Sequence, residues 1–138
     1  MGREGTCVKD LLYDEFQSTV SSHLVQSKSI LDAISKLSEA NARIQRGVSR
    51  AVTQCGCIRI DAKRQRIPEA SSLEELGDLL DSHVRGQLCD DCREQIESEI
   101  GNVMCYLAAV SDLLGVSLYD CLIKEEKRIE TLGMFLLT

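Results

Sequence analysis

Four of the seven cysteines form two close pairs, a pattern that could bind a metal ion. Cys55 and Cys57 flank a glycine, while Cys89 and Cys92 flank two aspartates, and 31 residues separate the pairs. Zinc in structural sites takes four soft ligands at about 2.3 Å, and two short cysteine turns can wrap around one ion. The spacing therefore predicts a closed structural zinc site formed by the thiolates of Cys55, Cys57, Cys89 and Cys92.

Two other interpretations of the paired cysteines stay open here, namely a redox dithiol and plain packing. A redox C-x-x-C motif normally opens a helix in a βαβ unit, and no parallel-sheet pattern surrounds the second pair. Both histidines lie in segments far from either pair, so neither is expected to be a ligand. Cys7, Cys105 and Cys121 stand alone, and we expect Cys105 and Cys121 to pack as small apolar side chains within helices.

A second candidate site consists of carboxylate and amide side chains on two predicted helices. Glu97, Glu99 and Asn102 lie at the start of the most regular apolar helix, and Glu39 and Asn41 occupy a comparable position on an earlier one. If these helices pack antiparallel, the side-chain oxygens could converge on Mg²⁺. The helix dipole alone also favours acidic residues near a helix N-terminus, so that explanation stays open.

Apolar periodicity predicts the two helices that must position these groups. Segment 30–55 carries apolar residues four and three apart, interrupted only by Asn41, and it delivers Cys55 at its end before Gly56. Segment 96–114 repeats the pattern directly after the second cysteine pair. The predicted seams are Ile30, Ile34, Leu37, Asn41, Ile44, Val48 and Ala51, and Ile96, Ile100, Val103, Leu107, Val110 and Leu114.

Shorter elements complete the predicted fold. We expect helices over 8–25 and 118–132, the second capped by Ser117. Residues 57–66 alternate weakly and predict a short strand or hairpin, and Ser72 with Glu75 forms a capping box that begins a helix reaching Gly86. The prediction is one all-α domain over 1–138, with a cysteine-bounded insertion over 55–92 that contains the strand or hairpin and the short helix.

Composition agrees with a single helical domain and limits its partners. The 138 residues are 43% hydrophobic and 28% charged, with one proline, five aromatic residues and no tryptophan, which favours helices over sheets. The net charge of −6 repels phosphate backbones, so we expect no nucleic-acid binding. The polar N-terminus and the lack of a long apolar run predict a cytoplasmic protein that is not bound to a membrane.

The second half of the chain resembles a known family. Residues 97–127, which begin Glu-Ser-Glu-Ile-Gly-Asn, resemble the second metal-binding helix and the following helix of MazG-like nucleotide pyrophosphohydrolases. Residues 36–43 are similar to the E-E-x-x-E helix of that family. The resemblance implies an all-α, MazG-like helical bundle in which carboxylates hold Mg²⁺ on a nucleoside triphosphate while water attacks and releases pyrophosphate.

The carboxylates of that family are only partly kept. Glu39 and Glu99 match two acidic positions, whereas Ala40, Arg43 and Asn102 replace three others. Because Mg²⁺ depends on anionic oxygens, the resemblance implies a non-catalytic or regulatory protein that binds a nucleotide or a protein partner. Short helices commonly complete their cores across a symmetric interface, so we also expect a homo-oligomer. The alternative is an active pyrophosphohydrolase with a rearranged acidic site of Glu39, Glu97, Glu99 and Asn102.

Overall fold

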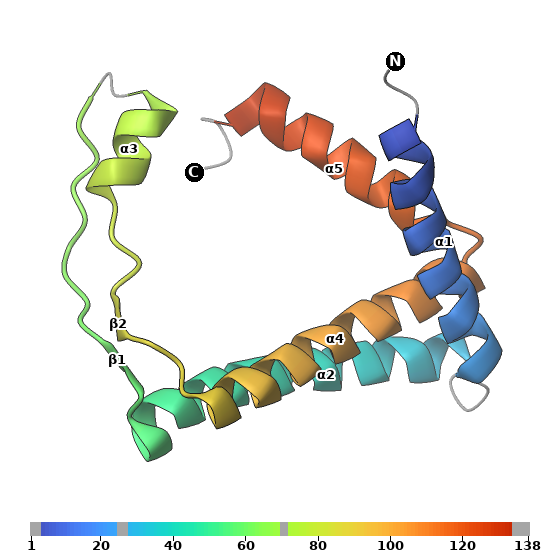
Figure 1. The fold of residues 1–138 in the computed structure, drawn as a ribbon, viewed down its shortest axis with the longest axis horizontal. Helices are drawn as coiled ribbons and strands as arrows, with labels where there is room; N and C mark the ends of the chain where they lie inside the picture. Colours follow the sequence, from blue (N-terminus) through green and yellow to red (C-terminus); the bar gives the residue numbers. More distant parts are fainter. Residues whose placement is uncertain (1–3, 25–27, 70–71, 134–138) are drawn as a thin grey trace.

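The computed structural model describes residues 4–24, 28–69 and 72–133, with side chains from Leu11 onward. The chain is mostly helical, which confirms the predominantly α class (Figure 1). Two long helices form its base, and a hairpin arm and two further helices rise from opposite ends of that base. The elements are α1 (Glu4–His23), α2 (Ile30–Arg50), a π-helical turn (Ala51–Cys55), β1 (Ile58–Ile60), α3 (Leu73–Leu79), β2 (Val84–Gly86), α4 (Asp90–Leu113) and α5 (Leu118–Leu132).

Helices α2 and α4 lie side by side and run antiparallel along a seam of small residues (Figure 1). Ala33, Ala40 and Gly47 are buried at seven-residue intervals on α2, and Ala51 continues the same row. A Cβ built at Gly47 would lie 3.4 Å from Cγ1 of Ile96, so the two backbones approach closely there. Small side chains permit this approach because they occupy little space between the two helix backbones.

The predicted seams are only partly correct: Ala51 of α2 and Ile96 of α4 are buried as predicted, whereas other members of both rows face outward. Ile34, Val48 and Leu107 are 46%, 39% and 41% exposed, and Asn41 is exposed as well. On α2, Ile34, Asn41 and Val48 each follow a buried small residue by one position, which is a rotation of about 100° around the helix. The outward-facing members of the two predicted rows lie on one side of the antiparallel pair. We call the residues Ile34, Leu37, Asn41, Ile44, Val48, Ile100, Val103, Leu107 and Val110 the apolar side.

The hydrophobic core lies at the other end of α4, where α1 packs against it. Val20 of α1 is buried together with Ala108 and Ala109 of α4, and Phe16, Leu24, Cys105 and Leu118 pack around them. Gln17 bridges to the next loop, since its amide nitrogen donates to the carbonyl of Val116 and its oxygen accepts from the backbone N–H of Leu118. These contacts fix α1 and the start of α5 on α4.

A tight turn separates α4 from α5. Gly115 has a φ of +67°, a conformation that suits glycine, and the hydroxyl of Ser117 accepts from the backbone N–H of Asp120, which confirms the predicted cap. Helix α5 begins and ends as the sequence predicted. Within the described ranges, no single helix is long and apolar enough to cross a membrane; α4 and α5 meet that criterion only together, across a bend of 108°.

The arm is an antiparallel hairpin with α3 at its tip (Figure 1). Strand β1 pairs with β2, with Ile58 opposite Gly86 and Ile60 opposite Val84. The capping box of Ser72 and Glu75 begins α3 as predicted, yet the expected helix to Gly86 is wrong because α3 ends at Leu79. The strand expected over 57–66 is also shorter, and its partner comes from beyond α3.

Side-chain hydrogen bonds explain why the chain leaves the helix after Leu79. The Asp81 carboxylate accepts from the backbone N–H of His83 at 3.0 Å and from the guanidinium of Arg85 at 2.5 and 2.9 Å. His83 has a φ of +61°, which no residue of a right-handed helix adopts. Gln65 joins both legs of the arm, because its amide bonds the backbone N–H and the carbonyl of Asp81.

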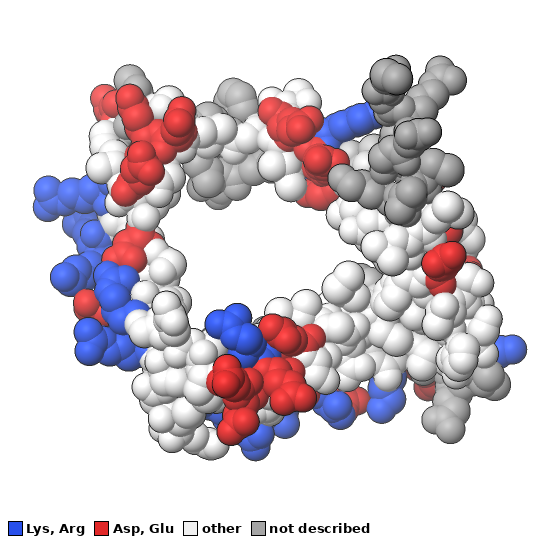
Figure 2. Space-filling model, viewed as in Figure 1, with Lys and Arg blue, Asp and Glu red and all other residues white. Residues whose placement is uncertain are grey.

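The tip of the arm meets the end of α5, so the chain surrounds a central opening (Figure 2). A Cβ built at Gly133 would lie 2.9 Å from Cδ1 of Leu73, which shows how closely α3 approaches this end of α5. The arm therefore spans from the cysteine-bearing end of the helix pair to the end of α5 (Figure 1).

Candidate metal centre

The first cysteine pair lies where α2 ends in a wider turn. The π-helical turn ends with the backbone N–H of Gly56 donating to the carbonyl of Ala51 at 2.9 Å. Gly56 has a φ of +75°, so the chain reverses direction between Cys55 and Cys57. The thiol of Cys57 also contacts the carbonyl of Ala51 at 3.8 Å. This turn explains how a pair with only one residue between its members presents both sulfur atoms on the same side.

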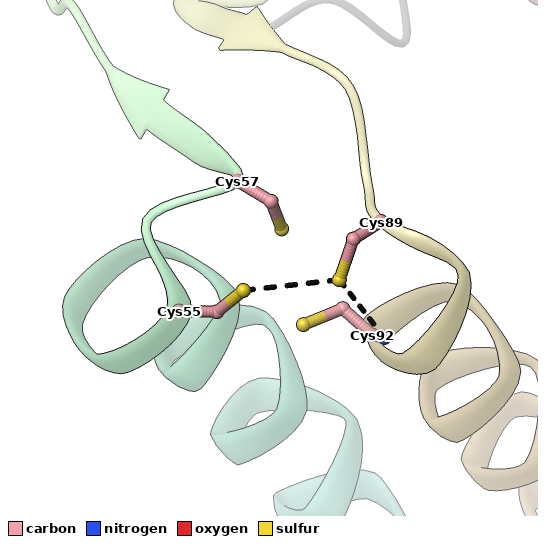
Figure 3. A group of neighbouring side chains, drawn as sticks. All are labelled: Cys55, Cys57, Cys89 and Cys92. Atoms are coloured by element: carbon pink, nitrogen blue, oxygen red, sulfur yellow. Dashed lines mark hydrogen bonds between the residues drawn. The ribbon is translucent and has the colours of Figure 1, made fainter.

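The second cysteine pair forms the beginning of α4. Cys89 is the N-cap residue of that helix, and its sulfur accepts from the backbone N–H of Cys92 at 3.5 Å. Cys92 lies in the first turn of α4 and projects toward the same space (Figure 3).

The four sulfur atoms converge between α2, the base of the arm and α4 (Figure 3). All four lie within 4.8 Å of one another, and the sulfur atoms of Cys55 and Cys89 are 3.7 Å apart. Tetrahedral coordination at about 2.3 Å requires ligand sulfur atoms about 3.8 Å apart. Within the described ranges, this is the one group of three or more histidine, cysteine or acidic side chains arranged to hold a metal. The predicted convergence of the two pairs is confirmed.

Hydrogen bonds shift the pKa values of Cys57 and Cys92 in opposite directions. The backbone N–H of Cys89 holds the pKa of Cys57 below its usual value. The pKa of Cys92 is raised to about 12, mainly by a thiol hydrogen bond with Cys89 and, to a smaller extent, by desolvation. Cysteine binds a metal as the thiolate, so a cation at this site must displace the protons that these thiols retain.

The other cysteines lie elsewhere in the fold. Cys105 is half-buried against the core between α1 and α4, as predicted, and burial raises its pKa. Cys121 is exposed on α5, so the expectation that it packs in the core is wrong. Its helix contacts α1 and α4 through other positions. The side chain of Cys7 lies outside the described part of the structure.

Glu39, the first residue of the predicted acidic site, forms ion pairs with two neighbouring cations. Glu39 is exposed on α2, where its carboxylate lies 3.2 Å from Nζ of Lys36 and 2.5 Å from the guanidinium of Arg43. Hydrogen bonds from Lys36 and Arg43 hold the pKa of Glu39 below its usual value. Asn41, predicted at a comparable position, is exposed on the apolar side instead.

The structure brings some of the remaining acidic-site residues to the same side as Glu39. Asn102 lines a small hollow with Glu39 and Arg43, and Glu99 lines an adjoining hollow that Arg43 also borders. Oε2 of Glu99 is buried and has no hydrogen-bond partner. Glu97 is exposed, and it precedes Glu99 by two residues, which places it on nearly the opposite face of α4.

Sequence reasoning missed the cations of this side. The larger hollow, of about 230 Å³, is lined by Arg43, Arg46, Gly47, Arg50, Gln95 and Glu99. The spacing of the three arginines by three and four residues was a visible signal that they share one face of α2. We call the two adjoining hollows the arginine groove.

Comparison with known protein families, with curated proteins and with solved structures finds no match to this chain.

Proposed function

We propose that Cys55, Cys57, Cys89 and Cys92 hold one zinc ion that clamps the arm to the helix pair. The convergence of the four sulfur atoms within 4.8 Å carries this proposal. Four thiolates fill a tetrahedral shell, so the site is structural and leaves no position for substrate. Each ligand pair belongs to a different helix end, and the two strands of the arm begin and end beside them (Figure 3). The ion would thus fix the direction in which the arm leaves the helices.

A redox dithiol is the competing interpretation, and the surroundings of Cys89 and Cys92 do not favour it. Redox C-x-x-C motifs open a helix in a βαβ unit. In the described part of this chain the strands form one antiparallel hairpin. The exposed sulfur of Cys55 also lies 3.7 Å from Cys89, in the spacing of co-ligands, beyond the roughly 2 Å of a disulfide.

The zinc proposal is tested by removing one ligand. Cys89→Ser should lose bound zinc and lower the free energy of unfolding, because the energy of metal binding contributes directly to folding. Cys121→Ser is the matched control, since Cys121 is exposed and distant from the cluster. Cobalt substitution adds a spectroscopic readout, because tetrahedral thiolate coordination gives intense visible absorption. Full zinc content in Cys89→Ser would contradict the proposal.

We further propose that the chain is a MazG-like scaffold that binds a nucleotide or protein partner without catalysis. The antiparallel α2 and α4 helices present Glu39, Glu99 and Asn102 on one side, which supports a common ancestry of this site with the family. The ion pairs of Glu39 with Lys36 and Arg43 argue against catalysis there. A carboxylate already bound by two cations is a poor Mg²⁺ ligand.

One observation favours the alternative of an active pyrophosphohydrolase. Oε2 of Glu99 is buried without a partner, as a carboxylate awaiting a cation would be. Incubation of the zinc-loaded protein with nucleoside triphosphates and Mg²⁺ or Mn²⁺ separates the two proposals. We expect no release of pyrophosphate. Turnover that disappears in Glu99→Gln would instead establish the enzyme.

The uncovered apolar side supports the proposal of a homo-oligomer. It runs along α2 and α4 opposite the arginine groove, and Asn41 is the one polar residue among the nine that define it. Helix pairs that leave such a stripe open commonly bury it against a second copy in a four-helix arrangement. A buried asparagine in such a seam fixes the register of the partners, which gives Asn41 a role.

A further inference from the structure

We propose that the arginine groove binds the pyrophosphate chain of its ligand directly through Arg43, Arg46 and Arg50, without Mg²⁺. This inference rests on the proposed binding function and names the chemistry of its ligand. The source of the chain is either free pyrophosphate or a nucleoside diphosphate, and the experiment below distinguishes them.

The charge of the groove favours an anion over a metal ion. Its lining contains four cations, Lys36 and the three arginines, and two carboxylates, Glu39 and Glu99. This local excess of positive charge occurs in a chain whose net charge is −6. A divalent cation would enter a site that already repels it, whereas a phosphate oxygen would be attracted.

Two of the arginines have their hydrogen-bonding capacity available. Glu39 is paired with Lys36 and Arg43. Within the ranges that the structure describes, neither Arg46 nor Arg50 forms an ion pair or a side-chain hydrogen bond. Each guanidinium group offers five N–H donors in a planar fork that matches two oxygens of one phosphate.

The spacing of the arginines matches an extended anion. Arg43, Arg46 and Arg50 lie on one face of α2, along a row about 10 Å long. The backbone of Gly47 lines the groove between them. A single phosphate can engage one or two of these side chains, whereas a pyrophosphate chain can reach further along the row.

Glu99 distinguishes direct anion binding from binding through Mg²⁺. If the groove held Mg²⁺, the buried oxygen of Glu99 would be a ligand and its loss would abolish binding. If the arginines bind the anion directly, Glu99 is a like charge at the edge of the groove and its neutralisation should strengthen binding. Glu99→Gln therefore has opposite effects under the two arrangements.

Isothermal titration of the zinc-loaded protein with inorganic pyrophosphate, in buffer without magnesium, tests the inference. We expect binding that Arg46→Gln and Arg50→Gln each weaken about tenfold, that salt weakens, and that Glu99→Gln strengthens. Arg64→Gln is the matched control, because it removes the same charge from an exposed position on the arm. Circular dichroism of each variant confirms that it folds.

A parallel titration with adenosine diphosphate identifies the source of the chain. Equal affinity for both ligands means that the groove recognises the phosphate chain itself, and tighter binding of the nucleotide means that the base or sugar contributes. Binding that requires Mg²⁺ and vanishes in Glu99→Gln would overturn the inference and support the enzymatic alternative. If zinc-loaded protein bound neither ligand under any condition, the inference would be wrong while the zinc clamp still stood.

Discussion

Gly86 faces the carbonyl oxygen of Cys57 so closely that a Cβ at Gly86 would lie 2.6 Å from that oxygen. Gly86 also has a φ of +84°, a conformation that other residues rarely adopt, and it pairs with Ile58 across the hairpin. The second strand of the arm can therefore pass the first cysteine turn only with glycine at this position. Because Cys89 follows shortly after, the base of the arm and the thiol cluster form one unit.

Gly86→Ala should destabilise this unit for two reasons: the positive φ is strained for alanine, and the new Cβ collides with the carbonyl oxygen of Cys57. We expect a loss of about 1–3 kcal/mol in the free energy of unfolding of the zinc-loaded protein, measured by urea titration. Gly77→Ala is the matched control, because no atom lies within 4 Å of a Cβ there and alanine is a better helix former. Equal stability of Gly86→Ala and the wild type would contradict this account.

The close approach of α2 and α4 at Gly47 gives a second prediction. A leucine at this position would push its side chain into Ile96 and separate the helices, at a cost of about 1–3 kcal/mol. Gly101→Leu places the same side chain on the open surface of α4, and we expect it to be tolerated. Thermal unfolding of both variants measures the difference, and similar losses in the two would show that the seam does not pass through Gly47.

The Asp81 network predicts a pH dependence of the arm. The hydrogen bond from Arg85, together with that from the backbone of His83, holds the pKa of Asp81 well below its usual range. A group whose pKa is lowered on folding stabilises the fold fully above its unfolded value of about 3.9, and that contribution is lost as the pH falls through the folded value. We expect the Asp81 carboxylate to stay ionised at about pH 3 in an NMR titration. Arg85→Gln should return its pKa toward the usual value; an unchanged titration in that variant would exclude the assigned cause.

The apolar side predicts the oligomeric state. We expect light scattering to give the mass of an oligomer for the wild type and of a monomer for Leu107→Glu, because a buried unpaired charge is strongly unfavourable. Leu79→Glu is the control, since Leu79 is 60% exposed on α3 and lies off this side. A monomeric wild type at high concentration would refute the expectation.

The sequence predicted best where the determining interactions are local. The cysteine pairs, the capping box at Ser72 and the cap at Ser117 depend on residues within a few positions, and the structure confirms all of them. The capping geometry needs no knowledge of the distant chain. The convergence of the two pairs could also be predicted, because two short cysteine turns can supply the four ligands of one tetrahedral site.

The incorrect predictions, of the helix seams and of a helix reaching Gly86, concern interactions that an apolar repeat in the sequence does not reveal. Ala33, Ala40 and Gly47 form the seam because they are small, yet the larger Ile34 and Val48 dominate any apolar pattern. The helical prediction to Gly86 failed because Val84 continues the spacing of the preceding leucines. Its pairing with Ile60, across the whole of α3, is a long-range contact that no local pattern contains.

The arginine groove shows a third kind of limit. Sequence reasoning treated Arg43 as a replacement at an acidic position and did not consider Arg46 and Arg50 beside it. Only the packing of α4 against α2 turns these residues into the lining of one hollow with Glu99.

The central claim is that the four converging thiolates bind zinc, and metal analysis of protein purified without added metal tests it most directly. The account predicts one equivalent of zinc per chain, retained through gel filtration and released by acid as the thiolates become protonated. Less than about half an equivalent of zinc, in protein whose thiols are shown to be reduced and intact, would contradict it.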